Sequence, residues 1–386
     1  IVPGRNYVIG VDTWNGTILW EKPIENFQRI GAYRDSGNMV LTDESVYCLS
    51  GSDCLKLNLH TGVEEKVIKL PASSSRYEWG YVGTVGSGLI GSTVKKGSVY
   101  RDTSYNAIYE NNYGDKTKVT CSDNLFASHR VSGKRIWVYR PKGAIVNPTI
   151  SINKKSVIFV ESGNEQTLRE KTSRLDFPEL IQKKGGKIQA LHLSSGKPLW
   201  QIPLKEMGDV QIMHLIATDA YIVLLYSHNK ALEGSATKKV HYTTRVFDAS
   251  SGKLLWEDTQ VTKHRPNLDH GEQDLHPALI DHQLIVEPQI YDVANGEKIG
   301  TFNRGGGGCG TISASSKSLF FRAGNIASYD INKKKAGTIT SVSRPGCWIN
   351  MIPASGMLLV PEGSSGCICK YAIQSSMGFV PVKEEK

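Results

Sequence analysis

One phrase recurs along this chain and constrains its fold more than any other feature. It consists of an apolar strand, a polar residue, a short turn ending in glycine, and a second strand with tryptophan four residues after the glycine. It reads VDTWNGTILW in residues 11–20, ALHLSSGKPLW in residues 190–200 and VFDASSGKLLW in residues 246–256. Glycine suits the end of a tight hairpin because it adopts positive φ at little cost. The tryptophans predict that each unit packs against a neighbour.

Weaker copies surround Gly62, Gly133 and Gly296, and one carries Lys334 in the glycine place. A period of about 40–45 residues with several short strands per unit is typical of a β-propeller. We therefore expect an all-β, eight-bladed β-propeller of four-stranded antiparallel blades, with seven blades as the alternative. A single domain over residues 1–386 accommodates all the copies.

Three longer intervals between copies predict insertions at about 95–122, 163–186 and 227–241. Each follows a second strand and precedes a third, so all three are expected on one face of the propeller. The middle insertion is charged, and we expect a solvated excursion with a short helix interrupted at Pro178.

The first and last blades are expected to differ from the others. The first shows only Tyr7–Val11 and Thr17–Lys22 and lacks its two inner strands, which suggests either a processed or truncated piece of a longer protein or strands supplied from elsewhere. The eighth blade is expected from strands in four segments: 349–353, 357–361, 367–373 and 377–382.

The phrase resembles the quinoprotein-type repeat of pyrroloquinoline quinone dehydrogenases and of the outer-membrane assembly propeller lipoproteins of bacteria. The later stretches 270–273, 308–315, 344–350 and 364–369 resemble a planctomycete-type branch of these propellers. The resemblance implies a propeller fold. Quinone dehydrogenases of the family use an adjacent Cys-Cys disulfide, which this chain lacks, so quinone-dependent catalysis is disfavoured.

Charge and hydropathy narrow the classes of partner. The 46 Lys and Arg outnumber the 37 Asp and Glu, which favours acidic partners or surfaces. The lysines are scattered among loops, which disfavours nucleic-acid binding. There is no run of eighteen apolar residues, so no transmembrane helix is predicted.

Seven cysteines suggest an oxidising compartment, and hence a periplasmic or exported protein of the bacterial cell envelope. Cys48 and Cys54 flank a hairpin-like turn and are predicted to form a disulfide. The remaining disulfide candidates are Cys309, Cys347, Cys367 and Cys369, for which reduced core thiols and a structural role remain open.

Loops that lead into innermost strands are expected to converge with the insertions on a channel rim. Candidate metal ligands there are His270, Glu272 and His276, although their spacing matches no standard zinc motif. Further binding candidates on the rim are Arg304, Cys309 and Arg344. No cofactor is predicted, and a metal ion is possible.

Four tryptophans are expected to dock neighbouring blades: Trp20, Trp137, Trp200 and Trp256. The leading functional hypothesis is a non-catalytic scaffold or binding module that engages a protein partner through its insertion-bearing face. The alternative is a metal- or cofactor-dependent enzyme whose site lies at the channel rim.

Overall fold

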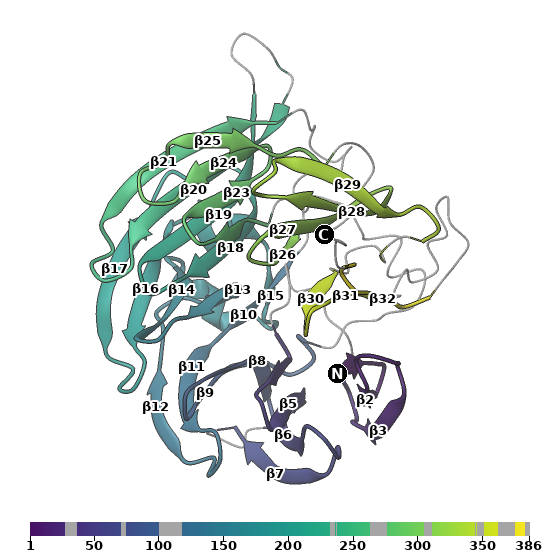
Figure 1. Cartoon of the computed structure of the whole chain (residues 1–386). Coiled ribbons are helices and arrows are strands. Elements are labelled where there is room, and N and C mark those ends of the chain that lie inside the picture. The colour runs from purple at the N-terminus through teal and green to yellow at the C-terminus, as the bar shows by residue number, and fades with distance from the viewer. Residues whose placement is uncertain are drawn as a thin grey trace. The chain divides into compact units, whose positions relative to one another are not determined.

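Eight antiparallel sheets make up the chain, as seen in a computed structural model (Figure 1). The structure describes residues 1–27, 37–70, 75–99, 118–231, 236, 238–262, 276–304, 311–343, 345, 351–361 and 375–382. The sheets are the blades of an all-β, eight-bladed β-propeller, which confirms the expected fold class and decides against seven blades. They fall into two compact units, residues 1–254 with 259–262 and residues 255–258 with 263–386.

The first unit holds five sheets. The first two contain β1 (Val2–Pro3), β2 (Tyr7–Val11) and β3 (Ile18–Pro23), then β4 (Met39–Leu41), β5 (Ser45–Ser50), β6 (Asp53–Asn58) and β7 (Glu64–Lys69). The third contains β8 (Tyr77–Val85), β9 (Gly88–Lys95), β11 (Asn124–His129) and β12 (Arg135–Tyr139). The fourth contains β10 (Val119–Ser122), β13 (Ile145–Ile152), β14 (Ser156–Ser162), β15 (Arg174–Leu175), β16 (Gly186–His192) and β17 (Pro198–Leu204). The fifth contains β18 (Val210–Ala217), β19 (Tyr221–Ala231), β20 (Lys238–Asp248) and β21 (Leu254–Val261).

The second unit holds three sheets. The first contains β22 (Ala278–Ile280), β23 (Gln283–Val286), β24 (Gln289–Asp292) and β25 (Lys298–Thr301). The second contains β26 (Ser313–Ala314), β27 (Ser318–Ala323), β28 (Asn325–Asp330) and β29 (Lys335–Thr340). The third contains β30 (Ile352–Ala354), β31 (Met357–Val360) and β32 (Met377–Phe379).

The repeated phrase forms the last hairpin of a blade. In the first copy, the Asp12 carboxylate accepts hydrogen bonds from the backbone N–H groups of Trp14 and Asn15, and Gly16 N–H donates to the Asp12 carbonyl. Asp248 caps its own turn in the same way. The last residue of the turn is glycine because the position requires positive φ, which is +75° at Gly16. Lys334, which occupies the same position in its copy, also has positive φ, at +50°.

Among the strand pairs whose register is described, a β-bulge follows this turn in five blades and sets which side chains turn toward the core. In the fourth sheet, Leu191 pairs with Pro198 and Ala190 with Trp200, so Leu199 has no partner across the ladder. The corresponding unpaired residues in other blades are Leu19, Glu65, Ile136 and Ile299. Because a bulge leaves its extra residue outside the ladder, Leu199 is exposed while Trp200 turns inward.

Each docking tryptophan lies on the glycine of the next copy of the phrase. A methyl group built on Gly62 would lie 2.5 Å from Trp20 Cε3, and one on Gly196 would lie 2.6 Å from Trp137 Cδ2. Trp200 on Gly252 and Trp256 on Gly296 repeat the contact. Trp20 and Trp137 are buried, whereas Trp200 and Trp256 are only partly buried.

Both end blades depart from the sequence-based expectation. Val2 of β1 pairs with Ile9, so the first blade has three strands rather than two. In the last blade Phe379 of β32 pairs with Leu358 of β31, so the segment expected as a fourth strand lies directly beside the second. The expected third strand, 367–373, is outside the described residues.

Candidate functional site

Most of the predicted rim residues are outside the part of the chain that the structure describes. They are His270, Glu272, Cys309 and Arg344; the disulfide candidates Cys347, Cys367 and Cys369 are also outside it. Their convergence on one face, and any metal or disulfide chemistry among them, stay predictions.

Two predicted rim residues are described. His276 Nδ1 lies 2.9 Å from the carbonyl oxygen of Pro277, and burial lowers the pKa of His276. Arg304 binds one carboxylate twice: its Nε donates to Glu287 Oε2 at 2.6 Å and its backbone N–H donates to Oε1 at 3.0 Å. The structure therefore gives Arg304 a partner within its own chain. Among the described residues, no three His, Cys, Asp or Glu side chains gather as a metal site requires.

The predicted disulfide between Cys48 and Cys54 is wrong. Both thiols are free and buried, and burial raises the pKa of Cys48 to about 12. The register explains the error: Cys54 pairs with Leu49, so Cys48, one residue earlier on β5, points to the opposite face of the sheet. The two side chains accordingly belong to different clusters of the core.

The first two insertions meet at an added pair of strands. β10, from the insertion at 95–122, pairs with β13, and β15, from the insertion at 163–186, pairs with β10. The fourth sheet thereby gains two strands and becomes six-stranded. Insertions that leave different blades are thus joined by backbone hydrogen bonds.

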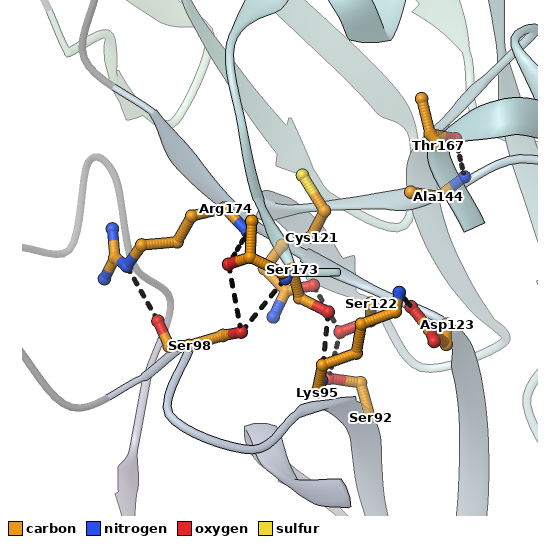
Figure 2. Close-up of polar contacts among 12 residues, drawn as sticks. Ser92, Lys95, Ser98, Cys121, Ser122, Asp123, Ala144, Thr167, Ser173 and Arg174 are labelled. Atoms are coloured by element: carbon orange, nitrogen blue, oxygen red, sulfur yellow. Dashed lines mark hydrogen bonds and ion pairs between the residues drawn. The ribbon is translucent and has the colours of Figure 1, made fainter. Parts of the chain in front are cut away.

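Side chains reinforce this junction (Figure 2). Lys95 N–H donates to Ser173 Oγ at 3.0 Å, and Ser173 N–H donates to Ser98 Oγ at 3.0 Å. Arg174 Nε donates to the carbonyl oxygen of Ser98 at 2.7 Å. Ser173 and Arg174 on the second insertion therefore hold the start of the first.

A largely buried ion pair lies beside the junction. Lys95 Nζ is 2.9 Å from Asp123 Oδ1, with the two side chains 16% and 13% exposed. Burial raises the pKa of Asp123, against the opposing effect of the Lys95 ammonium. Because each charge depends on the other for compensation, the pair fixes β9 against the segment that follows β10.

The second insertion is packed rather than solvated. It contains a 3₁₀ turn, η1 (Glu165–Arg169), and a π-helical turn, η2 (Pro178–Gln182). Pro178 begins η2 instead of interrupting a helix, because proline is tolerated in the first turn, where no N–H partner is needed. Leu180 and Ile181 are buried in the same core cluster as Val160. The expectation of a solvated excursion was wrong.

Asp209 connects the second insertion with the third. Gln182 Nε2 donates to Asp209 Oδ1 at 3.1 Å, and the backbone N–H of Asn229 donates to the Asp209 carbonyl at 3.2 Å. Asn229 lies in the extended end of β19, where the third insertion was expected. That insertion is a continuation of the β19–β20 hairpin, at least as far as Ala231 and Lys238.

A pocket of 370 Å³ opens where the second insertion leaves the sheet, lined by Lys142, Glu161, Ser162, Gly163, Glu165, Gly186, Lys187, Gln201 and Pro203. The Glu161 side chain, 1% exposed, accepts from Tyr139 Oη at 2.6 Å and from Lys142 N–H at 3.0 Å. Lys187 Nζ is 3.2 Å from Glu161 Oε1. The buried carboxylate and the Lys187 ammonium, on a side chain that is 25% exposed, give the pocket both charges.

We use the term insertion surface for the surface formed by the described residues within 95–99, 118–123, 163–186 and 227–241. It is one connected structure within the first unit, because hydrogen bonds join the first insertion to the second, and Asp209 bonds to both the second and the third. Sequence reasoning placed the insertions on one face but missed the Lys95–Asp123 pair and Glu161. The sequence signal that could have indicated Lys95 and Glu161 is a charged residue at the end of an apolar strand.

Comparison with known proteins finds a similar solved structure but no relative by sequence. No family model matches the chain, and no curated protein matches it. The structure is similar to that of BamB from Moraxella catarrhalis, with 14% sequence identity, 84% of this chain and 89% of that chain covered, and a TM-score of 0.37. Among the described residues, no helix has the length and apolar character needed to cross a membrane.

Proposed function

We propose that this protein is a non-catalytic propeller scaffold of the bacterial cell envelope that binds a protein partner through the insertion surface. The observation that supports the proposal is the joining of the three insertions into one structure. A propeller needs none of these segments to close its blades, yet they are held together by specific hydrogen bonds and a buried ion pair. Irregular segments on a rigid scaffold are where binding residues concentrate.

The polar character of this surface favours a partner of protein type. Exposed charges of both signs alternate along the second insertion at Glu165, Arg169, Glu170 and Lys171. Mixed charges around a packed base are typical of the rim of a protein interface and give specificity more than affinity. The location in the envelope rests on the resemblance of the repeat to that of exported propellers.

The test is co-purification from the native cells with the tagged full-length chain. Reversing the exposed charges at Glu165, Arg169 and Lys171 leaves the buried base of the insertion untouched. We expect this variant to lose the partner that the wild type retains. A control variant reverses three charges elsewhere, at Lys134, Lys197 and Lys253, which lie in or beside the repeated turns, and it should retain the partner. Equal retention by both variants would refute the insertion surface as the binding site.

A further inference from the structure

The β19–β20 hairpin is longer than its blade requires. Each strand has eleven residues, more than any other described strand, and the ladder continues without a break from Tyr221–Asp248 to Ala231–Lys238. The register places His228 opposite His241 and Lys230 opposite Lys239. Because side chains alternate along a strand, these four lie on one face, with Tyr226 and Thr243 next along it.

This row of side chains becomes more exposed toward the end of the hairpin. Tyr226, Thr243 and His241 are buried, His228 and Lys239 are partly buried, and Lys230 is exposed. Like charges directly opposite each other on neighbouring strands are unfavourable. Lys230 and Lys239 place two positive charges opposite each other beside the histidine pair, and an anion bound there would be attracted to them. We call His228, His241, Lys230 and Lys239 the basic row.

The histidines are positioned by packing and by hydroxyl groups. Their ring centroids are 5.4 Å apart, His228 Nε2 is 3.1 Å from Thr243 Oγ1, and Thr243 Oγ1 is 2.8 Å from Thr259 Oγ1. His241 is 7% exposed, and its buried Nε2 has no hydrogen-bond partner in the described part of the chain. A buried imidazole nitrogen without a partner is a position that a ligand atom can satisfy.

The charges that surround the pair are mostly positive. Lys230 faces both histidines, and Arg245 also faces His228. The one carboxylate among the groups acting on His228 is Asp209, on the segment before β18, whose Oδ1 accepts from Gln182 of η2. Burial and then these cations lower the pKa of His228 to about 4, and burial and Lys230 lower the pKa of His241.

We propose that the basic row binds an acidic segment of the protein partner, with a carboxylate received between the histidine pair and the lysine pair. The proposal rests on the proposed function and names the chemistry of the partner at one part of the insertion surface. Lysine ammonium groups and imidazole N–H groups donate hydrogen bonds to carboxylate oxygens. In the basic row the lysine pair and the histidine pair follow one another along the hairpin, so an extended peptide lying along it can present acidic side chains to both pairs.

Binding of this kind is linked to pH in a definite direction. A bound carboxylate favours the protonated imidazole, so the pKa of each histidine rises in the complex. Affinity should increase as the pH falls through the raised pKa of the complex and should level off below the pKa of the free protein. A divalent metal ion at the same imidazoles would show the reverse, since protons compete with metals for the ring nitrogen.

The experiment measures binding of a fluorescent oligoglutamate peptide to the full chain by fluorescence anisotropy. We expect binding that is several times tighter at about pH 5.5 than at about pH 7.5. Lys230→Gln with Lys239→Gln should weaken binding about fivefold or more, as loss of about 1 kcal/mol implies. His228→Gln with His241→Gln should remove most of the pH dependence. The control, Lys197→Gln with Lys253→Gln, removes the same charge elsewhere and should leave binding unchanged.

Three results would overturn the inference. The first is that the control variant loses as much oligoglutamate affinity as the lysine variant. The second is that binding becomes weaker as the pH falls, and the third is that a single-stranded oligonucleotide binds equally well. Thermal unfolding of each variant shows whether the fold is retained. Co-purification separates this inference from the proposed function: if the lysine variant retains the native partner while the Glu165, Arg169 and Lys171 reversal loses it, the insertion surface stands and the basic row fails.

Discussion

The indole N–H of Trp137 donates to the carbonyl oxygen of Leu193 at 2.8 Å, joining two blades whose residues lie 56 positions apart. Trp20 with Leu59, Trp200 with Ala249 and Trp256 with Val293 repeat this bond. In each pair the acceptor lies three residues before the glycine on which the indole ring packs. One residue therefore joins neighbouring blades by a hydrogen bond and by apolar contact together.

Trp137→Ala should lower the free energy of unfolding by about 3 kcal/mol or more, because it removes a buried ring and leaves the Leu193 carbonyl without its donor. The measurement is chemical denaturation. Trp14→Ala is the matched control, since Trp14 is 65% exposed at the tip of a turn and its loss should cost less than about 0.5 kcal/mol. Similar losses in the two variants would contradict the docking role.

The glycines of the phrase should differ in their tolerance of alanine. Gly16 and Gly196 both have positive φ, but a methyl group on Gly16 meets open space and one on Gly196 meets the Trp137 ring. Gly16→Ala should cost about 1 kcal/mol from backbone strain alone. Gly196→Ala should cost clearly more, and the difference should shrink in a Trp137→Ala background if the ring is its cause. If Gly196→Ala cost the same stability in the wild-type and Trp137→Ala backgrounds, the contact between Gly196 and the Trp137 ring would be unimportant.

The ion pair at the insertion junction should be sensitive to loss of one partner. Lys95→Met leaves the Asp123 carboxylate buried without its cation and should destabilise the protein by about 3 kcal/mol. The double variant Lys95→Met with Asp123→Leu removes both charges and should recover much of this loss. Chemical denaturation of the wild type, the two single variants Lys95→Met and Asp123→Leu, and the double variant gives the coupling, and additive losses would contradict a paired, buried arrangement.

Stability should depend on pH through His228. Its pKa falls to about 4 in the folded protein, against about 6.5 in an unfolded chain. Between these values the unfolded chain binds more protons, so this residue lowers stability as the pH falls from about 6.5 toward about 4. The difference between the denaturation midpoints of the wild type and His228→Gln should therefore be constant above about pH 6.5 and should change as the pH falls toward about 4. The wild type should lose more stability on acidification than the variant, and equal losses would contradict the burial of this imidazole.

Much of the fold could be predicted because it depends on local chemistry that repeats. Asp12, Gly16 and Trp20 each have one physical task, and the same tasks recur at fixed spacing. The structure gives even Lys334 the positive φ expected of the glycine place. The predictions failed where a single residue of register decides the outcome: Cys48 and Cys54 look adjacent across a turn, but strand alternation separates their side chains.

The candidate surface was harder to predict because it depends on contacts between segments that are distant in sequence. Nothing in the sequence near Ser173 or Arg174 indicates that they would bind the segment at Ser98. Ser173 and Ser98 are 75 residues apart in the chain. The basic row did leave a trace, since His228 with His241 and Lys230 with Lys239 are placed symmetrically about the hairpin tip. That symmetry has meaning only once the segment is known to be a continuous hairpin.

Site-specific photo-cross-linking in the native cells tests the central claim most directly. A photoreactive amino acid is placed at Glu165, Arg169 or Lys230 on the insertion surface, and at Lys134, Lys197 or Lys253 as controls in or beside the repeated turns. We expect adducts to a common protein partner from the first three positions and none from the controls. Adducts to that partner only from the controls, or equally from all six positions, would contradict the claim that the insertion surface is the binding site.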